Sequence, residues 1–175
     1  MLEGKTVNLR VEEKEDLPYV AEWLNSLRHS GEYVPLMQAS KAELEKQYEH
    51  FSAETKYFMI EKKDGTRIGT VVHFVSAMQY EIGYTVIPSE RGKGYASEAI
   101  QIIVDYLFLS KDINRVQAFV DQRNVPSVRV IEKAGFKREA TLRKAFFMYG
   151  EWRDMLLYGI LREEWKEPRI LTKTT

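Results

Sequence analysis

The stretch that decides the fold runs from Glu81 to Ile100 and reads EIGYTVIPSERGKGYASEAI. It begins with the alternation typical of a strand, passes through two closely spaced glycines and ends in an apolar pattern typical of a helix. The glycines, Gly92 and Gly94, allow positive φ and a close approach of the backbone to a ligand. The helix that follows offers unpaired N–H groups and the positive end of its dipole. The segment therefore predicts a binding site for phosphate oxygens.

Two familiar nucleotide-binding loops fit this segment less well. A Walker loop ends in Gly-Lys-Ser/Thr, whereas this loop continues from Gly94 into Tyr-Ala. The dinucleotide fingerprint G-x-G-x-x-G is approached by Gly92, Gly94 and Ser97, but it opens a parallel βαβ unit, and the preceding strands here are expected to pair as hairpins. A plain glycine-bearing connection between a strand and a helix is the remaining alternative.

The pattern on either side of the loop predicts a single α+β domain over residues 1–175, with a largely antiparallel sheet. Strands are expected at 6–11, 57–62, 67–75, 79–87, 115–120, 136–143 and 154–161, and helices after Asp16 and at 41–51, 96–109 and 125–134. Asp16 and Asn124 are expected helix N-caps, and Asp64-Gly65 a hairpin turn. From about residue 166 a polar, frayed tail is expected.

Composition excludes several classes of function. Lysine plus arginine and aspartate plus glutamate both count 26, so the chain lacks the basic excess of a nucleic-acid-binding protein. It contains no cysteine, which excludes disulfides and thiolate nucleophiles, and its three histidines show no metal-ligand spacing. No segment has the profile of a signal peptide or a membrane span, so we expect a cytoplasmic protein without metal or membrane partners.

Three segments carry a resemblance to a known family. The stretch 81–100 resembles the acetyl-CoA-binding core of the GNAT acyltransferases, whose loop pattern Arg/Gln-x-x-Gly-x-Gly/Ala is matched by Arg91, Gly94 and Ala96. The segment Asn124-x-x-Ser127, followed by Gly135-Phe136, resembles the family's N-x-x-S…G-F segment. The chain's ending is similar to the branch that acetylates ribosomal-protein N-termini, through Gly150, Asp154, Tyr158 and Glu164-Trp165. The resemblance extends over nearly the whole chain, with the segments in the expected order.

The resemblance implies a GNAT fold, with a mostly antiparallel sheet between helices in three α/β/α layers, and acetyl-CoA as cofactor. Backbone amides from Gly92 to Ser97 would bind the pyrophosphate, in a loop made by Arg91, Gly92, Lys93, Gly94, Tyr95, Ala96 and Ser97. Thr85 and Val86 would pair with the pantetheine arm. Asn124 and Ser127 would face the thioester end, and Lys133 would reach the cofactor's phosphates. Helix capping is the plainer role for Asn124 and Ser127.

Acetyl transfer to an amine needs a base, a polarised carbonyl and a proton for the leaving thiolate. Glu81 is the candidate base, since it lies on the central strand out of phase with the apolar residues; an exposed structural carboxylate is its alternative. Many relatives place a proton-donating tyrosine where this chain has Ile131, so Ser127 and Tyr149 are the candidate donors here. Phe146 stands where the ribosomal branch can carry a glutamate.

The acceptor is expected to be a small-molecule or peptide amine. At pH 7 deprotonation costs an α-amine about 1.4 kcal/mol and a lysine-type amine about 4.6 kcal/mol. With Glu81 as its one candidate base, the site is expected to favour the more easily deprotonated amine, a peptide N-terminus. A polycationic acceptor would favour an acidic pocket, but the acidic run Glu12, Glu13, Glu15 and Asp16 is expected to be an exposed turn. A polyamine or aminoglycoside N-acetyltransferase and a non-catalytic CoA-binding module are the alternatives. Trp23, Tyr33, Met37, Phe74 and Tyr80 are candidate acceptor-pocket residues, and a homodimer is possible.

Overall fold

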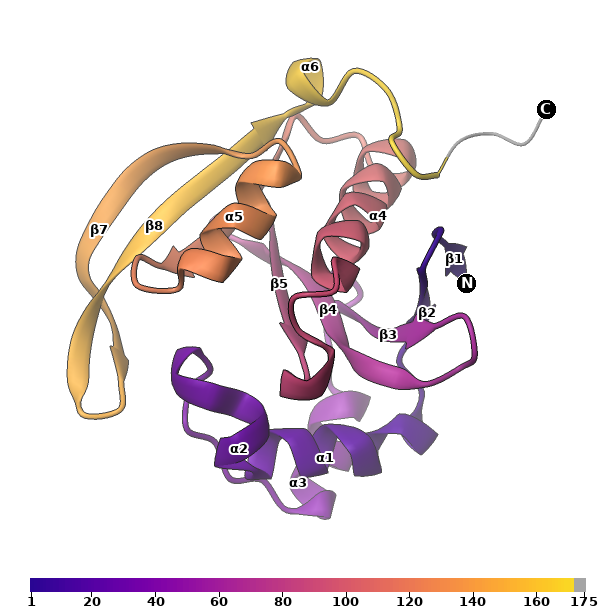
Figure 1. The fold of residues 1–175 in the computed structure, drawn as a ribbon, viewed down its shortest axis with the longest axis vertical. Coiled ribbons are helices and arrows are strands. Elements are labelled where there is room, and N and C mark those ends of the chain that lie inside the picture. The colour runs from indigo at the N-terminus through magenta and orange to yellow at the C-terminus, as the bar shows by residue number, and fades with distance from the viewer. Residues whose placement is uncertain (172–175) are drawn as a thin grey trace.

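The sheet forms the centre of the molecule, and the computed structural model describes residues 1–171 (Figure 1). Its eight strands follow the order β1-β2-β3-β4-β5-β6-β8-β7. Neighbouring strands pair antiparallel except β5 and β6, which are parallel, as expected for an α+β fold. The strands are β1 Leu2–Glu3, β2 Val7–Val11, β3 Lys56–Lys62, β4 Arg67–Ser76, β5 Gln79–Val86, β6 Arg115–Asp121, β7 Lys137–Met148 and β8 Glu151–Leu161.

Helices cover both faces of the sheet. Successive residues of a strand point to opposite faces, and on β3 Tyr57 stacks on Phe51, just after α3, while Phe58 meets Tyr106 of α4. The three α/β/α layers are therefore confirmed. The helices are α1 Leu17–Asn25, α2 Leu27–Ser30, α3 Lys41–Glu49, α4 Tyr95–Ser110, α5 Val125–Lys133 and α6 Arg162–Trp165, with short 3-10 turns at Lys14–Asp16, Gly31–Tyr33 and Pro88–Glu90.

The core lies between the sheet and the helices α4 and α5. The apolar side chains of α4 are buried against the sheet: Ala99, Ile100, Ile102, Ile103, Val104, Leu107 and Phe108. On β5, Ile82 and Val86 join this core, whereas Glu81 and Thr85 point to the other face. Such burial of aliphatic side chains, worth roughly 1.5–3 kcal/mol each, fixes the position of α4 and of the loop that precedes it.

The parallel strands β5 and β6 separate in the middle of the sheet. Within the described chain they are joined at two residue pairs, Tyr80–Val116 and Glu81–Gln117. Strand β5 continues to Val86, so its second half runs without a partner on the β6 side. This separation leaves space between the strands, at the place where the glycine loop begins.

Several helix ends and turns that were predicted from short stretches of sequence are present in the structure. The Asn124 side chain accepts from Ser127 N at 3.2 Å and caps α5, and Gly135 follows that helix with φ +99°. The predicted turn at Asp64-Gly65 is present, with Gly65 at φ +82°. These positions were predictable because the cap or turn depends on residues close in sequence.

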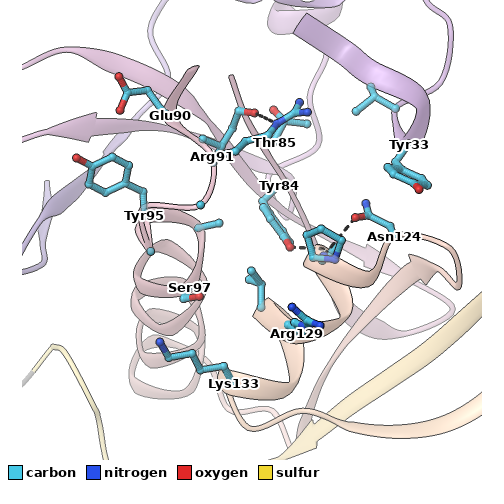
Figure 2. Close-up of a pocket in the computed structure, with 18 of the residues that line it drawn as sticks. Tyr33, Tyr84, Thr85, Glu90, Arg91, Tyr95, Ser97, Asn124, Arg129 and Lys133 are labelled. Carbon is cyan, nitrogen blue, oxygen red and sulfur yellow. Dashed lines mark hydrogen bonds between the residues drawn. The ribbon is translucent and has the colours of Figure 1, made fainter. Parts of the chain in front are cut away.

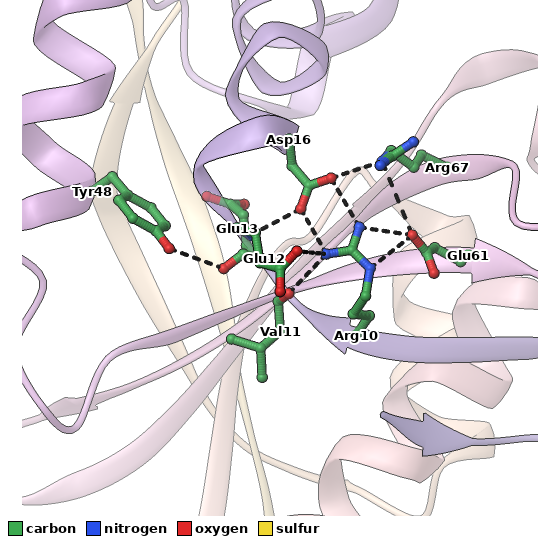
Figure 3. A network of polar contacts seen from close by, with 8 residues as sticks. All are labelled: Arg10, Val11, Glu12, Glu13, Asp16, Tyr48, Glu61 and Arg67. Carbon is green, nitrogen blue, oxygen red and sulfur yellow. Dashed lines mark hydrogen bonds and ion pairs between the residues drawn. The ribbon is translucent and has the colours of Figure 1, made fainter.

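Asp16 occupies the N-cap position of α1, as predicted, but its side chain makes no capping hydrogen bond to that helix. Of the acidic run expected to be exposed, Glu13 and Glu15 are exposed, whereas Glu12 and Asp16 are buried. The Asp16 carboxylate is buried and accepts from Arg10 and Arg67 at 2.7–2.9 Å (Figure 3). Arg10 also pairs with Glu61 of β3, and Glu12 is buried beside this group. These partners come from β2, β3 and β4, so a reading of the local sequence could not identify them.

The chain's last third also differs from its prediction. Strands β7 and β8 form one long hairpin that turns at Tyr149-Gly150, whereas shorter strands were expected. Most β7 side chains are exposed, so the strand lacks the alternation that marks a half-buried strand. The expected frayed tail is docked as far as Leu171, because the amides of Arg169, Ile170 and Leu171 donate to the buried Asp105 carboxylate.

Candidate active site

A cavity of about 520 Å³ opens where β5 separates from β6, between the starts of α4 and α5 (Figure 2). It brings together predicted site residues from three separate segments. These are Thr85, Val86, Arg91, Gly92, Gly94, Tyr95, Ala96, Ser97, Asn124, Ser127 and Lys133. Of the predicted cofactor-binding and catalytic residues, three lie outside this lining: Glu81, Lys93 and Tyr149. Of the five candidate acceptor-pocket residues, Tyr33 lines the cavity, and Trp23, Met37, Phe74 and Tyr80 do not.

The glycine loop forms one end of the cavity. Gly92 and Gly94 have φ of +77° and +88°, and a Cβ atom built on either would meet no atom within 4 Å. The backbone there is open to a ligand, and side chains would occupy that open space. Helix α4 begins at Tyr95 without a side-chain cap, so the N–H groups of its first turn face the cavity end. This cradle fits a pyrophosphate group.

The charged side chains around the loop have different roles. The Arg91 guanidinium donates to the carbonyls of Val86 and His29, at 2.8 and 3.0 Å, and so ties the loop to the segment after α1. Lys93 lies outside the cavity lining and pairs with Glu90 at 3.0 Å. Positive charge facing the cavity comes instead from Arg129 and Lys133. Arg129 was missed, although its spacing of four residues from Lys133 places both on one helix face.

The start of α5 contributes two polar side chains to the cavity, the amide of Asn124 and the hydroxyl of Ser127. Asn124 caps the helix, as its plainer role required, and both it and Ser127 line the cavity. The Ser127 Oγ lies 2.9 Å from the Tyr84 Oη. Burial raises the pKa of Tyr84, and the bond to Ser127 opposes part of that shift. Tyr84 was missed because its place in the strand pattern marks it as a core residue.

Glu81 lies where β5 and β6 part. Gln117, its partner across the parallel strands, donates from Nε2 to the Glu81 Oε2 at 3.3 Å. Burial raises the pKa of Glu81, and this hydrogen bond partly opposes the shift. Glu81 shares a face of β5 with Thr85, which lines the cavity, so it approaches the site from the side opposite α4.

Tyr149 belongs to the wall of the site and not to its interior. At the tip of the β7–β8 hairpin its hydroxyl donates to the carbonyl of Gly31 at 2.8 Å. Arg153 donates to the carbonyl of Glu32 at 2.6 Å, beside the same turn. These two bonds hold the hairpin against the segment Ser30–Val34, whose residues Glu32 and Tyr33 line the cavity. We call this pair of bonds the hairpin clasp.

The cavity end near the hairpin clasp has a different character from the loop end. Glu32 supplies a carboxylate and Tyr33 an aromatic ring, while Arg129 and Lys133 belong to the α5 side. Tyr33 was among the predicted pocket aromatics; Glu32 was missed, since nothing in the local sequence distinguishes it from an exposed acid. Among the described residues, no group of three or more His, Asp or Glu side chains could hold a metal ion. In that part of the chain no helix has both the length and the apolarity to cross a bilayer.

Comparisons with known proteins agree with this geometry. A family model described as an acetyltransferase (GNAT) domain matches residues 6–137. The protein named Probable N-acetyltransferase YjcK of Bacillus subtilis (strain 168) is 33% identical over 178 residues, which cover 94% of this chain and 98% of that protein. Spermidine N(1)-acetyltransferase of Escherichia coli (strain K12) is 25% identical over 171 residues, covering 94% and 91%.

A solved structure extends the similarity to the fold. It is the spermidine N-acetyltransferase of Vibrio cholerae in complex with CoA and spermine, with a TM-score of 0.83, 25% identity, and coverage of 93% of this chain and 99% of that one. The GNAT fold is thereby confirmed, as is the use of acetyl-CoA by the family. The ribosomal-protein branch is not specifically confirmed by these matches.

Proposed function

Because this chain belongs to the GNAT family of acetyl-CoA-dependent N-acetyltransferases, we propose that it transfers the acetyl group to a primary amine of a polyamine. The observation that supports this acceptor most is the extent of the similarity to spermidine N-acetyltransferases, which covers 94% of this chain in sequence. The comparisons therefore favour the polyamine alternative over the peptide N-terminus that the sequence had favoured.

For the donor, we assign the loop end of the cavity to the phosphates of acetyl-CoA. The first-turn amides of α4 and the open backbone at Gly92 and Gly94 would hold the pyrophosphate. Lys133 and Arg129 would supply counter-charge from α5. Arg91 would act indirectly, by holding the loop in place through the Val86 and His29 carbonyls. The bound cofactor supplies the activated acetyl group.

For the acceptor, we assign the end of the cavity near the hairpin clasp. A polyamine carries several ammonium groups, and a cation is attracted by the Glu32 carboxylate and by the face of the Tyr33 ring. Glu90 also lines the cavity beside the glycine loop, but its carboxylate pairs with Lys93 and Lys62. The remaining charges would orient the two substrates, with phosphates toward Arg129 and Lys133 and ammonium groups toward Glu32. Orientation of two reactants is itself a large source of rate enhancement.

The reacting amine must lose a proton, and Glu81 is our candidate base. Neutralising an alkylammonium near pH 7 costs about 4.6 kcal/mol, so the base must be effective near that pH. Burial raises the pKa of Glu81, which increases its basicity. Its position at the separation of β5 and β6 lets it act directly or through a water molecule from the face opposite the cofactor helices.

The test is a thiol-release assay with acetyl-CoA at a fixed pH. Spermidine, spermine, an aminoglycoside and a set of peptides with free N-termini would be compared by kcat/KM. We expect spermidine or spermine to exceed every peptide by at least tenfold. A peptide that exceeds both polyamines would overturn the acceptor and restore the α-amine, whose deprotonation costs about 3 kcal/mol less.

A further inference from the structure

We propose that the Tyr84 phenol supplies the proton that the leaving thiolate takes up, with Ser127 as its hydrogen-bonded partner. This inference rests on acetyl transfer from acetyl-CoA in the cavity and is independent of which amine accepts the group. It assigns a chemical role to a residue whose strand position suggests only packing.

A donor is needed because the family's tyrosine position is occupied by an aliphatic residue. Ile131 lies one helical turn after Ser127 and is 1% exposed, so its side chain belongs to the core. The second predicted donor, Tyr149, is held by the carbonyl of Gly31 in the hairpin clasp. Neither side chain can deliver a proton within the cavity.

The other hydroxyl groups that line the cavity either donate to backbone carbonyls or lie away from Tyr84. The Tyr33 Oη donates to the carbonyl of Arg123 at 3.1 Å, and the Ser30 Oγ donates to the carbonyl of Trp23 at 3.1 Å. Thr85 points to the face of β5 opposite Tyr84, and its hydroxyl pairs there with that of Thr70 at 3.2 Å. Tyr95 and Ser97 lie in the first turn of α4 at the glycine loop, where the phosphate groups are assigned.

Tyr84 and Ser127 form a pair of hydroxyls with one proton left over. Their oxygens lie 2.9 Å apart, and either can be the donor in that bond. Two O–H groups share one hydrogen bond, so the second proton remains available to a ligand in the cavity. If Ser127 donates to Tyr84, the phenol O–H is free to point at the ligand. If Tyr84 donates, Ser127 can pass the proton on.

The acidity of the phenol suits this task. Burial raises the pKa of Tyr84, so the group holds its proton throughout the neutral range and is present as an acid. As the amine nitrogen bonds to the acetyl carbon, the carbon–sulfur bond breaks and the sulfur takes the electron pair. The amine attacks in its neutral form, after Glu81 has taken the ammonium proton and released it to solvent. The sulfur then gains the Tyr84 proton, Glu81 takes the second N–H proton as the amide forms, and solvent reprotonates Tyr84 through Ser127 and takes the proton from Glu81. The number of protons is conserved.

The test uses the complex of the enzyme with free CoA, in which no acetyl group or acceptor is present. A phenol that donates to the sulfur lowers the pKa of the bound thiol, which is read from the ultraviolet absorbance of the thiolate during a pH titration. We expect Tyr84→Phe to raise that thiol pKa by about one unit, which corresponds to about 1.4 kcal/mol. Turnover with the best acceptor should fall by roughly 10²-fold, the lower range for a lost general acid.

Two further variants make the outcome decisive. Ser127→Ala should shift the thiol pKa in the same direction by a smaller amount, and it tests the pair even if Tyr84→Phe folds poorly. Tyr158→Phe is the control: it removes a comparable buried phenol, bonded to Glu132 at 2.9 Å outside the cavity lining, and should leave the thiol pKa unchanged. An unchanged thiol pKa in both Tyr84→Phe and Ser127→Ala would overturn the proposal, even if turnover fell.

Because the titration contains no acceptor, its result does not depend on the polyamine assignment. If Tyr84→Phe shifts the thiol pKa as expected but peptides are turned over faster than polyamines, only the polyamine assignment is overturned. Polyamine turnover with no thiol pKa shift would overturn the role of Tyr84 alone.

Discussion

At the scale of single residues, substitution of Gly94 is expected to affect both the stability of the loop and its binding of CoA. Its φ of +88° is unfavourable for any residue with a Cβ, while the space around that Cβ is empty. Gly94→Val should therefore cost a few kcal/mol in stability through backbone strain and weaken CoA binding by at least tenfold through obstruction. Calorimetry with CoA measures the binding effect.

Gly65 provides a matched control for this substitution. It has nearly the same φ, +82°, and equally open surroundings, but lies in the β3–β4 turn away from the cavity. Gly65→Val should show a similar loss of stability and normal CoA affinity. Equal CoA affinities in the two variants would remove the loop from the binding site.

Glu81 determines the acidic limb of the pH profile in our proposal. Because burial raises its pKa, the acidic limb of kcat/KM should lie above the usual range of a glutamate. Glu81→Gln keeps the shape and removes the base, so kcat/KM should fall by 10²- to 10⁴-fold and that limb should disappear. A pH profile that overlays the parent's would make Glu81 a structural carboxylate.

Gln117 allows the same assignment to be tested without removal of the carboxylate. Its side-chain donor stabilises the ionised form of Glu81. Gln117→Leu should therefore move the acidic limb to higher pH and leave the maximal rate similar. This direction is specific to a titrating Glu81, since a loss of packing alone would lower the rate at every pH.

At the scale of elements, the β7–β8 hairpin acts as a wall of the site through the hairpin clasp. Tyr149→Phe removes the bond to the Gly31 carbonyl and keeps the ring. A hydrogen bond of this kind is worth about 1 kcal/mol, so the segment that carries Glu32 should become more mobile. We expect KM for the acceptor to rise several-fold while the Kd for CoA stays within twofold.

Tyr48→Phe is the control for the hairpin clasp. It removes another phenol-to-carbonyl contact, from Tyr48 to Glu12 at 3.4 Å, and neither residue lines the cavity. A similar rise of acceptor KM in this variant would show that the effect reflects general loosening and not the wall.

At the scale of the whole molecule, the buried acidic group near the chain's start makes stability depend on pH. Burial raises the pKa of Glu12 to about 7, with the Asp16 charge adding to the shift and Arg10 opposing it. A carboxyl whose pKa is higher in the folded state favours folding when protonated. Its contribution is fully present below pH 4.5 and is lost as the pH rises to about 7, a loss of about 3 kcal/mol.

Glu12→Gln should remove this dependence. The difference in unfolding free energy, variant minus parent, should grow by about 3 kcal/mol between pH 4.5 and 8, measured by denaturant titration. Asp16 acts in a separate range. Burial raises its pKa, but the hydrogen bonds from Arg10, the Glu13 amide and Arg67 together lower it by more, so its contribution is lost in strong acid. A constant difference between pH 4.5 and 8 would contradict the raised pKa of Glu12.

The sequence determined the features that depend on neighbouring residues. The glycine loop, the Asn124 cap and the Gly65 turn each follow from a few adjacent side chains and their preferred φ and ψ. The apolar stripe of α4 follows from helical periodicity. With the loop resemblance, these were sufficient to predict an α+β fold with a phosphate cradle and acetyl-CoA as the ligand.

Only the tertiary structure decided which distant residues meet. The Tyr84–Ser127 pair, the Gln117–Glu81 bond and the hairpin clasp join residues from different strands and helices. In the same way, the side chain of Asp16 was predicted to cap a helix and instead binds two arginines from other strands, because a buried carboxylate is stabilised by charged partners wherever the sheet brings them. Sheet pairing sets these contacts, and the strand register that determines it results from packing of the whole core and not from any local pattern.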